Sequence, residues 1–138
     1  GVPGHQLNIV QAIGIAVQAS PSEGADFDLV LDGIIGYSLK GTPHGRAADL
    51  IGWANTQSAP VVSLDAPSGL DATTGTAHDP SITSAATLTL ALPKSGLNHP
   101  HVGTLYLADI GVPAELYGCF LGLAVPPIFA AGEVLRLE

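Results

Sequence analysis

The chain has 138 residues, a length typical of one domain. Apolar residues make up 46% of it and charged residues only 12%, which is about half of the usual charged fraction. The formal net charge is −8 with four Lys and Arg residues, so the protein would repel the phosphate backbone of a nucleic acid. Gly, Pro, Thr or Asp interrupts every apolar run before the roughly twenty residues that a membrane helix needs. These features exclude nucleic-acid binding and membrane insertion.

The N-terminal sequence GVPGHQLNIV lacks a basic segment followed by an apolar run. We therefore expect no secretory signal and a cytoplasmic location. Cys119 is the single cysteine, which excludes an internal disulfide, and we expect it to be a small buried hydrophobic residue. We expect one domain over residues 1–138, with part of its uncharged surface covered by a second copy or another partner.

The first half of the chain predicts helices and strands in alternation. Residues 5–13 have a near-helical spacing of apolar positions that ends at a glycine, and residues 15–17 are expected to form a short strand. DLVLD at 28–32 is a compact apolar run between acids and predicts a buried strand. A helix is predicted over 46–58, and APVVSLD at 59–65 predicts the next strand.

Two further strands are expected at 86–92 and 103–111, separated by a loop that contains Lys94 and a small group of histidines. Strand, helix and strand in succession favour an α/β fold, a parallel sheet with helices on both faces. Residues 119–138 are weakly patterned and interrupted by two prolines, so they receive no assignment.

Two aspartates close predicted strands. Asp32 follows the first apolar run and Asp65 follows the second. Ligands of open parallel sheets bind outside the carboxyl ends of the strands, and a buried carboxylate needs a compensating charge, metal or hydrogen bond. We therefore expect the two acids to lie close together at this edge as part of a site. The alternative is that each aspartate caps a neighbouring turn.

The segments after these aspartates have the composition of ligand-binding loops. GIIGYSLKGTPHG follows Asp32, and its four glycines allow a ligand to approach backbone N–H groups; the alternative is a mobile loop without a ligand. After the second strand, Pro67 stiffens a turn in which Asp65 and Ser68 offer a carboxylate and a hydroxyl. A hard cation such as potassium, or a sugar hydroxyl, suits these oxygens.

The remaining polar residues favour no other chemistry. His99 and His101 have no obvious third metal ligand and are expected to be solvent-exposed loop residues. Ser68 is not within a GxSxG nucleophile elbow, which argues against covalent hydrolysis. No GxGxxG is present, which disfavours an NAD-dependent oxidoreductase.

DLVLDGIIGYSLKG, APVVSLDAPSGLDATTG, LPKSGL and GTLYLADIGVP occur in this order and resemble the YjeF N-terminal domain family of NAD(P)H-hydrate epimerases. The resemblance covers about residues 26–113, and HQLNIVQAIGI is similar to the preceding helix of the family. It implies a Rossmann-like sheet, a homodimer, and epimerisation of hydrated NADH or NADPH (NADHX or NADPHX) with a bound potassium ion.

The resemblance also implies a role for individual residues. Asp32 and Ser68 match the potassium ligands of the family, and Asp65 matches its acidic residue, which acts on the substrate and would be catalytic here. The residues that match the nucleotide-contacting loop are Gly36, Tyr37, Ser38, Leu39, Lys40, Gly41 and Thr42.

One family motif is not found. The asparagine-rich segment GNNGGDG, which supplies phosphate contacts and another potassium ligand, does not occur in this sequence. The resemblance therefore implies an N-terminally truncated domain, a degenerate relative, or a chain whose site a partner completes. An epimerase is the first hypothesis, and a nucleotide-binding or protein-interaction module of the same fold is the alternative.

Overall fold

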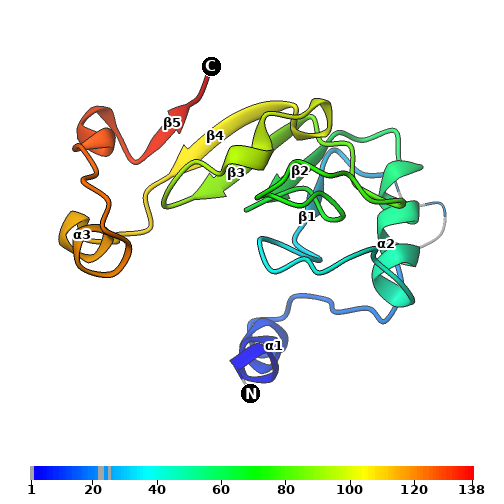
Figure 1. Ribbon diagram of the computed structural model, residues 1–138. Helices are drawn as coiled ribbons and strands as arrows, with labels where there is room; N and C mark the ends of the chain where they lie inside the picture. Colours follow the sequence, from blue (N-terminus) through cyan, green and yellow to red (C-terminus); the bar gives the residue numbers. More distant parts are fainter. Residues whose placement is uncertain (1, 22–23, 25) are drawn as a thin grey trace.

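The computed structural model describes residues 2–21, 24 and 26–138 and contains a five-stranded sheet (Figure 1). Its strands lie in chain order: β1 (Val30–Asp32), β2 (Val61–Leu64), β3 (Ala86–Leu90), β4 (Thr104–Ala108) and β5 (Val134–Arg136). β1 to β4 run parallel, as expected, whereas β5 pairs antiparallel with β4. The predicted α/β fold with a parallel sheet is therefore confirmed, and an antiparallel strand is added at one edge.

Three α-helices are described: α1 (Val2–Ala12), α2 (Arg46–Asn55) and α3 (Ala114–Leu121). Short 3₁₀ turns follow β3 and α3: η1 (Ser95–Leu97), η2 (Pro100–Val102) and η3 (Ile128–Ala131). Both predicted helices form at their expected places. None of the helices in this described part of the chain is long and apolar enough to cross a membrane.

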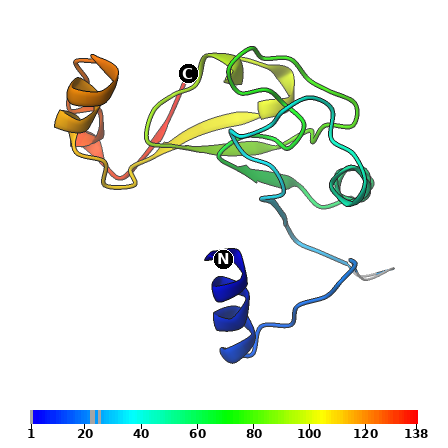
Figure 2. The same cartoon turned by 60° about the horizontal axis from the view of Figure 1, so that its bottom comes forward.

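The segment between α1 and β1 differs from expectation. Residues 15–17, predicted as a strand, have no regular secondary structure and pair with no strand in the described ranges, and Ile15 is 54% exposed. The prediction was wrong because an apolar triplet needs a neighbouring strand to complete its hydrogen bonds. Figures 1 and 2 show α1 set apart from the sheet at the end of this segment.

One face of the sheet carries the core. Helix α2 packs there, and its Ile51 and Ala54 are buried against Val30 of β1 and Val61 of β2. A second buried cluster lies among the loops that follow β2 and β3. It consists of Ala66, Leu70, Ala72, Leu97 and Val102. These two clusters fix the ends of β1, β2 and β3 relative to one another.

The opposite face of the sheet is open. Side chains alternate between the two faces of a strand, so Leu31 and Leu64 point away from the core. They are 62% and 42% exposed, although we expected a second layer of helices here. Much apolar surface therefore remains in contact with solvent.

The C-terminal region contains more structure than its sequence pattern indicates. Residues 119–138 include the end of α3, together with η3 and β5. Cys119 is exposed, so its expected burial was wrong. The reason is that α3 buries none of its residues against the rest of the described chain.

Candidate active site

Asp32 and Ser68 form the buried centre of the site. Asp32 is the last residue of β1, and Ser68 lies in the loop after β2. The Ser68 hydroxyl donates to Asp32 Oδ1 at 2.6 Å, and the Ser68 backbone N–H donates to Asp32 Oδ2 at 2.8 Å. Ser63 Oγ donates to Asp32 Oδ2 at 2.7 Å, and the Ile34 N–H donates to Oδ1 at 3.3 Å. These four donors compensate a carboxylate that is only 2% exposed.

Ser68 also fixes the start of the glycine-spaced loop. The Ile35 backbone N–H donates to Ser68 Oγ at 2.8 Å, and the Ile35 carbonyl oxygen lies 3.1 Å from the same hydroxyl. Ser68 is completely buried, so these contacts form away from solvent. One side chain thus joins the ends of β1 and β2 to the loop that follows β1.

The oxygens of this network have the chemistry that potassium takes as ligands. Asp32 provides a carboxylate, Ser68 a hydroxyl and Ile35 a carbonyl. Every buried side-chain N or O atom in the described part of the chain already has a hydrogen-bond partner. The described residues contain no group of three His, Cys, Asp or Glu side chains suited to a metal. The donor set fits a weakly bound hard cation in type, and the network is complete without one.

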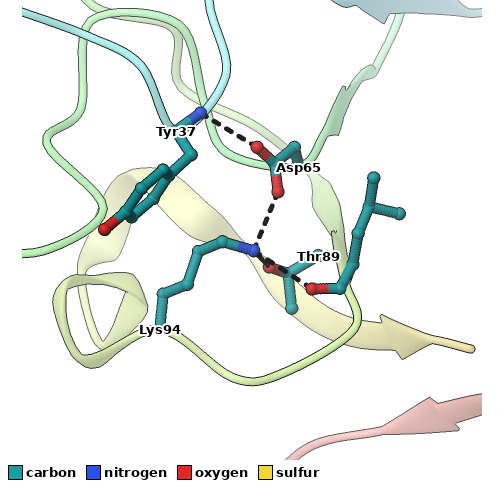
Figure 3. Close-up of polar contacts among 5 residues, drawn as sticks. Tyr37, Asp65, Thr89 and Lys94 are labelled. Carbon is teal, nitrogen blue, oxygen red and sulfur yellow. Dashed lines mark hydrogen bonds and ion pairs between the residues drawn. The ribbon is translucent and has the colours of Figure 1, made fainter. Parts of the chain in front are cut away.

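Asp65 lies at the same edge, directly after β2 (Figure 3). Its φ of 71° is in the left-handed region, which few non-glycine residues adopt. The Tyr37 backbone N–H donates to Asp65 Oδ2 at 2.9 Å, and Lys94 Nζ lies 2.8 Å from Oδ1. The Asp65 side chain is 24% exposed, so a ligand in the surrounding loops has access to it.

Gly36 allows the loop to approach this carboxylate. A Cβ atom at position 36 would lie 2.8 Å from Asp65 Oδ2, closer than Cβ atoms approach such neighbours in real structures. The absence of a side chain therefore lets the Tyr37 N–H reach Asp65.

Lys94 is a site residue that the sequence did not identify. Its ammonium group donates to Thr89 Oγ1 at 2.8 Å and to the Leu90 carbonyl at 3.2 Å, in addition to its ion pair with Asp65. The sequence analysis placed Lys94 in a loop and within the LPKSGL segment of the family resemblance, but assigned it no role. Its position directly after the predicted β3 strand, at the edge where the acids lie, is the signal that could have indicated it.

The structure therefore confirms the predicted position of both aspartates at the carboxyl ends of neighbouring parallel strands. Two residues of the same loop contact the two parts of the site. The Ile35 N–H donates to Ser68, and the Tyr37 N–H donates to Asp65. The roles assigned to Asp32, Asp65 and Ser68 stay predictions.

Two cavities lie beside this loop. The first, of about 310 Å³, is lined by the loop from Ile35 to Thr42 and by the start of α2, and it includes Ser38, Leu39 and Lys40. The second, of about 270 Å³, lies between Tyr37, Lys94 and Tyr117. Gly41 lines neither cavity and has a positive φ of 71°, so it serves the turn. The predicted nucleotide loop is thus bordered by space on two sides.

A larger cavity, of about 760 Å³, lies between the η1 and η2 region and the C-terminus, and Lys94 also lines it. None of the residues predicted for the site lines it. His99 lines this cavity, and the rings of His99 and His101 pack edge to face with their centroids 4.8 Å apart. Both histidines are half-buried rather than solvent-exposed as expected, and burial, with a smaller effect of His99, lowers the pKa of His101.

Several known proteins with similar sequences share one name. The NAD(P)H-hydrate epimerase of Dehalogenimonas lykanthroporepellens is 44% identical over 117 residues, which cover 84% of this chain and 48% of that protein. The epimerase of Truepera radiovictrix is 41% identical over 118 residues, which cover 85% of this chain and 54% of that protein. The chain thus spans about half the length of these curated relatives.

A solved structure and a family model complete the comparison. The crystal structure of yeast ynu0 matches with a TM-score of 0.64 at 24% sequence identity. The match covers 80% of this chain and 46% of the yeast chain, and it supports the fold. The family model described as YjeF-related protein N-terminus matches residues 4–96. This match begins at α1, which confirms that the first helix is part of the similarity. The chain therefore belongs to the family of YjeF-related protein N-terminal domains.

Proposed function

We propose that this protein is an NAD(P)H-hydrate epimerase, which interconverts the R and S epimers of NADHX and NADPHX. The observation that carries the proposal is the Asp65 carboxylate, which is accessible at the sheet edge and held by Tyr37 N–H and Lys94. Two curated epimerases, which are 44% and 41% identical to the chain, support the substrate class.

In the proposed reaction, Asp65 exchanges a proton with the hydroxyl group on the hydrated nicotinamide ring. Transfer of the proton to this hydroxyl breaks the carbon–oxygen bond and releases water, and the ring nitrogen stabilises the resulting iminium-like cation. Water then adds to either face of the ring and returns a proton to Asp65, so configuration is lost without any redox change. General acid–base help of this kind typically accelerates a reaction by about 10² to 10⁴-fold.

The loop from Gly36 to Thr42 is proposed to bind the nucleotide. It borders two cavities, and Lys40, an exposed residue, lines the first of them. The chain has a net charge of −8, so a local cation is needed to attract the pyrophosphate of the substrate. These observations support a position of the phosphates near Lys40 and of the hydrated ring near Asp65.

Potassium is proposed to bind at Asp32 and Ser68, with the Ile35 carbonyl as a further oxygen. The ion supplies a positive charge beside the buried Asp32 carboxylate. The hydrogen bonds of Asp32 and Ser68 hold the loop that leads to Tyr37, and thereby support the position of Asp65. Substitution of Ser68 by Ala is expected to weaken the potassium dependence of the rate.

A second candidate function is nucleotide binding without turnover. The observation that favours it is that each carboxylate oxygen of Asp65 already has a donor within the protein, Lys94 at 2.8 Å and the Tyr37 N–H at 2.9 Å. A binding module retains the loop and its cavities and has no need for proton transfer.

One experiment separates the two functions. Epimerisation of NADHX is followed by chiral separation with the protein and with buffer alone, in potassium and in sodium buffer, and nucleotide binding is measured by calorimetry. The epimerase proposal expects a rate above that of buffer, larger in potassium than in sodium. Binding combined with a rate equal to that of buffer contradicts the epimerase and supports the module.

We further propose a cytoplasmic homodimer. The open face of the sheet, with Leu31 and Leu64, supports a protein contact because large exposed apolar patches usually mark interaction sites. Light scattering tests this proposal, and a monomer at high concentration contradicts it.

A further inference from the structure

Lys94 is bound more completely than an ordinary surface lysine. Its side chain is only 17% exposed, and its ammonium group has three acceptors: Asp65 Oδ1, Thr89 Oγ1 and the Leu90 carbonyl. An ammonium group has three N–H donors, so each donor has one acceptor. Surface lysines are normally flexible and solvated, whereas this one has a single defined position.

The anchors of Lys94 belong to the rigid part of the fold. Thr89 is completely buried within β3, and Leu90 is the last residue of that strand. The Asp65 backbone N–H donates to the carbonyl of Leu88 in the same strand. Lys94 and Asp65 are therefore both attached to β3, and the ion pair lies between two elements that cannot move independently.

Each carboxylate oxygen of Asp65 has one fixed donor. Lys94 holds Oδ1, and the Tyr37 N–H holds Oδ2 (Figure 3). A carboxylate accepts about four hydrogen bonds, so lone pairs of both oxygens remain for a substrate. The two donors differ in origin: the Tyr37 amide lies in the exposed loop, whereas Lys94 is anchored on the sheet.

We propose that Lys94 is a positioning residue for epimerisation, which fixes the Asp65 carboxylate on the β3 side while Tyr37 and the substrate approach from the loop. This inference rests on the proposed function and adds to it a residue that does not touch the reacting atoms. Misplacement of a reacting group by about 1 Å can lower a rate roughly 100-fold, so the position of this carboxylate matters for catalysis.

The test compares Lys94→Met, Lys94→Arg and Thr89→Val with the wild-type protein. Lys94→Met keeps most of the side-chain volume and removes all three donors, so kcat is expected to fall roughly 10- to 100-fold with KM changed less than about twofold. Lys94→Arg keeps a cation that can pair with Asp65 and is expected to restore part of kcat. Thr89→Val removes one anchor of Lys94 without touching Asp65, and is expected to give a smaller loss.

A second measurement does not depend on turnover. The Tyr37 amide is protected from hydrogen exchange by its bond to Asp65, so NMR is expected to show faster exchange of this amide in Lys94→Met. The Gly75 amide, which donates to the Asp71 carbonyl outside this contact, serves as an internal control for global unfolding.

The outcomes are distinguishable. A wild-type protein no faster than buffer refutes the proposed function, while the exchange measurement still decides whether Lys94 positions Asp65. An active wild type with an unchanged kcat in Lys94→Met, or an unchanged Tyr37 exchange rate in that variant, overturns the role of Lys94.

Discussion

Substitution of Ser68 by Ala tests the buried network at its centre. The change removes the hydroxyl that donates to Asp32 Oδ1 at 2.6 Å and accepts from the Ile35 N–H at 2.8 Å. A hydrogen bond to a charged group contributes about 1.5–3 kcal/mol and a neutral one about 0.5–1.5 kcal/mol. Because Ser68 is completely buried, water cannot replace the lost group. We expect the free energy of unfolding to fall by about 2–4 kcal/mol, a large part of the 5–15 kcal/mol typical of a domain.

Urea denaturation followed by the fluorescence of Trp53, the single tryptophan, measures this change. Ser95→Ala is the matched control, because the Ser95 hydroxyl makes one hydrogen bond, to the Thr73 carbonyl at 2.9 Å, at an exposed position. The control is expected to lose less than about 1 kcal/mol. If the two variants unfold at the same urea concentration, the Asp32 network does not stabilise the fold as described.

Three further predictions concern the loop and the histidine pair. Gly36→Ala is expected to displace the Asp65 carboxylate and lower the epimerisation rate roughly tenfold or more, whereas Gly33→Ala, whose added Cβ lies 3.9 Å from its nearest neighbour, serves as the control. Lys40→Ala is expected to weaken nucleotide binding several-fold in low salt and less in high salt, as calorimetry at two ionic strengths can measure. Because the pKa of His101 is lowered in the folded state, the unfolded chain binds a proton more readily as the pH falls below 6.5. The contribution of the neutral His101 to the free energy of unfolding is therefore complete above this pH and decreases below it. His101→Gln is expected to reduce this decrease in urea titrations between about pH 7 and pH 5. If the free energy of unfolding of His101→Gln changes with pH as steeply as that of wild type, His101 is not the group responsible.

The sequence predicts the elements whose pattern is local. The sequence runs at 28–32 and 59–65, which form β1 and β2, are short and apolar and end in an aspartate, and parallel topology alone brings Asp32 and Asp65 to one edge. The pairing of β5 depends on β4, and the contact of Lys94 with Asp65 depends on how the loop after β3 folds back. Neither can be predicted from a local pattern. Residues 15–17 show the reverse case, because their strand-like composition finds no partner in the described chain.

Residue burial could be predicted only in part. Ile51 and Ala54 are buried as expected for the apolar side of a crossover helix. Cys119 is exposed because its helix buries none of its residues in the described chain, and the amino-acid composition of the helix does not predict this. Gly36 was predicted as a loop residue, but the reason for its lack of a side chain, the approach to Asp65 Oδ2, is a tertiary property.

The central claim is that Asp65 exchanges the proton during epimerisation. The most direct test starts from one purified epimer of NADHX and measures its initial rate of interconversion in potassium buffer with wild type, with Asp65→Asn and with buffer alone. Asparagine tolerates the left-handed backbone of this position, so the variant removes the proton-transfer group with little change in volume. Wild type is expected to be faster than buffer, and Asp65→Asn is expected to be no faster than buffer while it still binds nucleotide. A variant as fast as wild type, or a wild type no faster than buffer, would contradict the central claim.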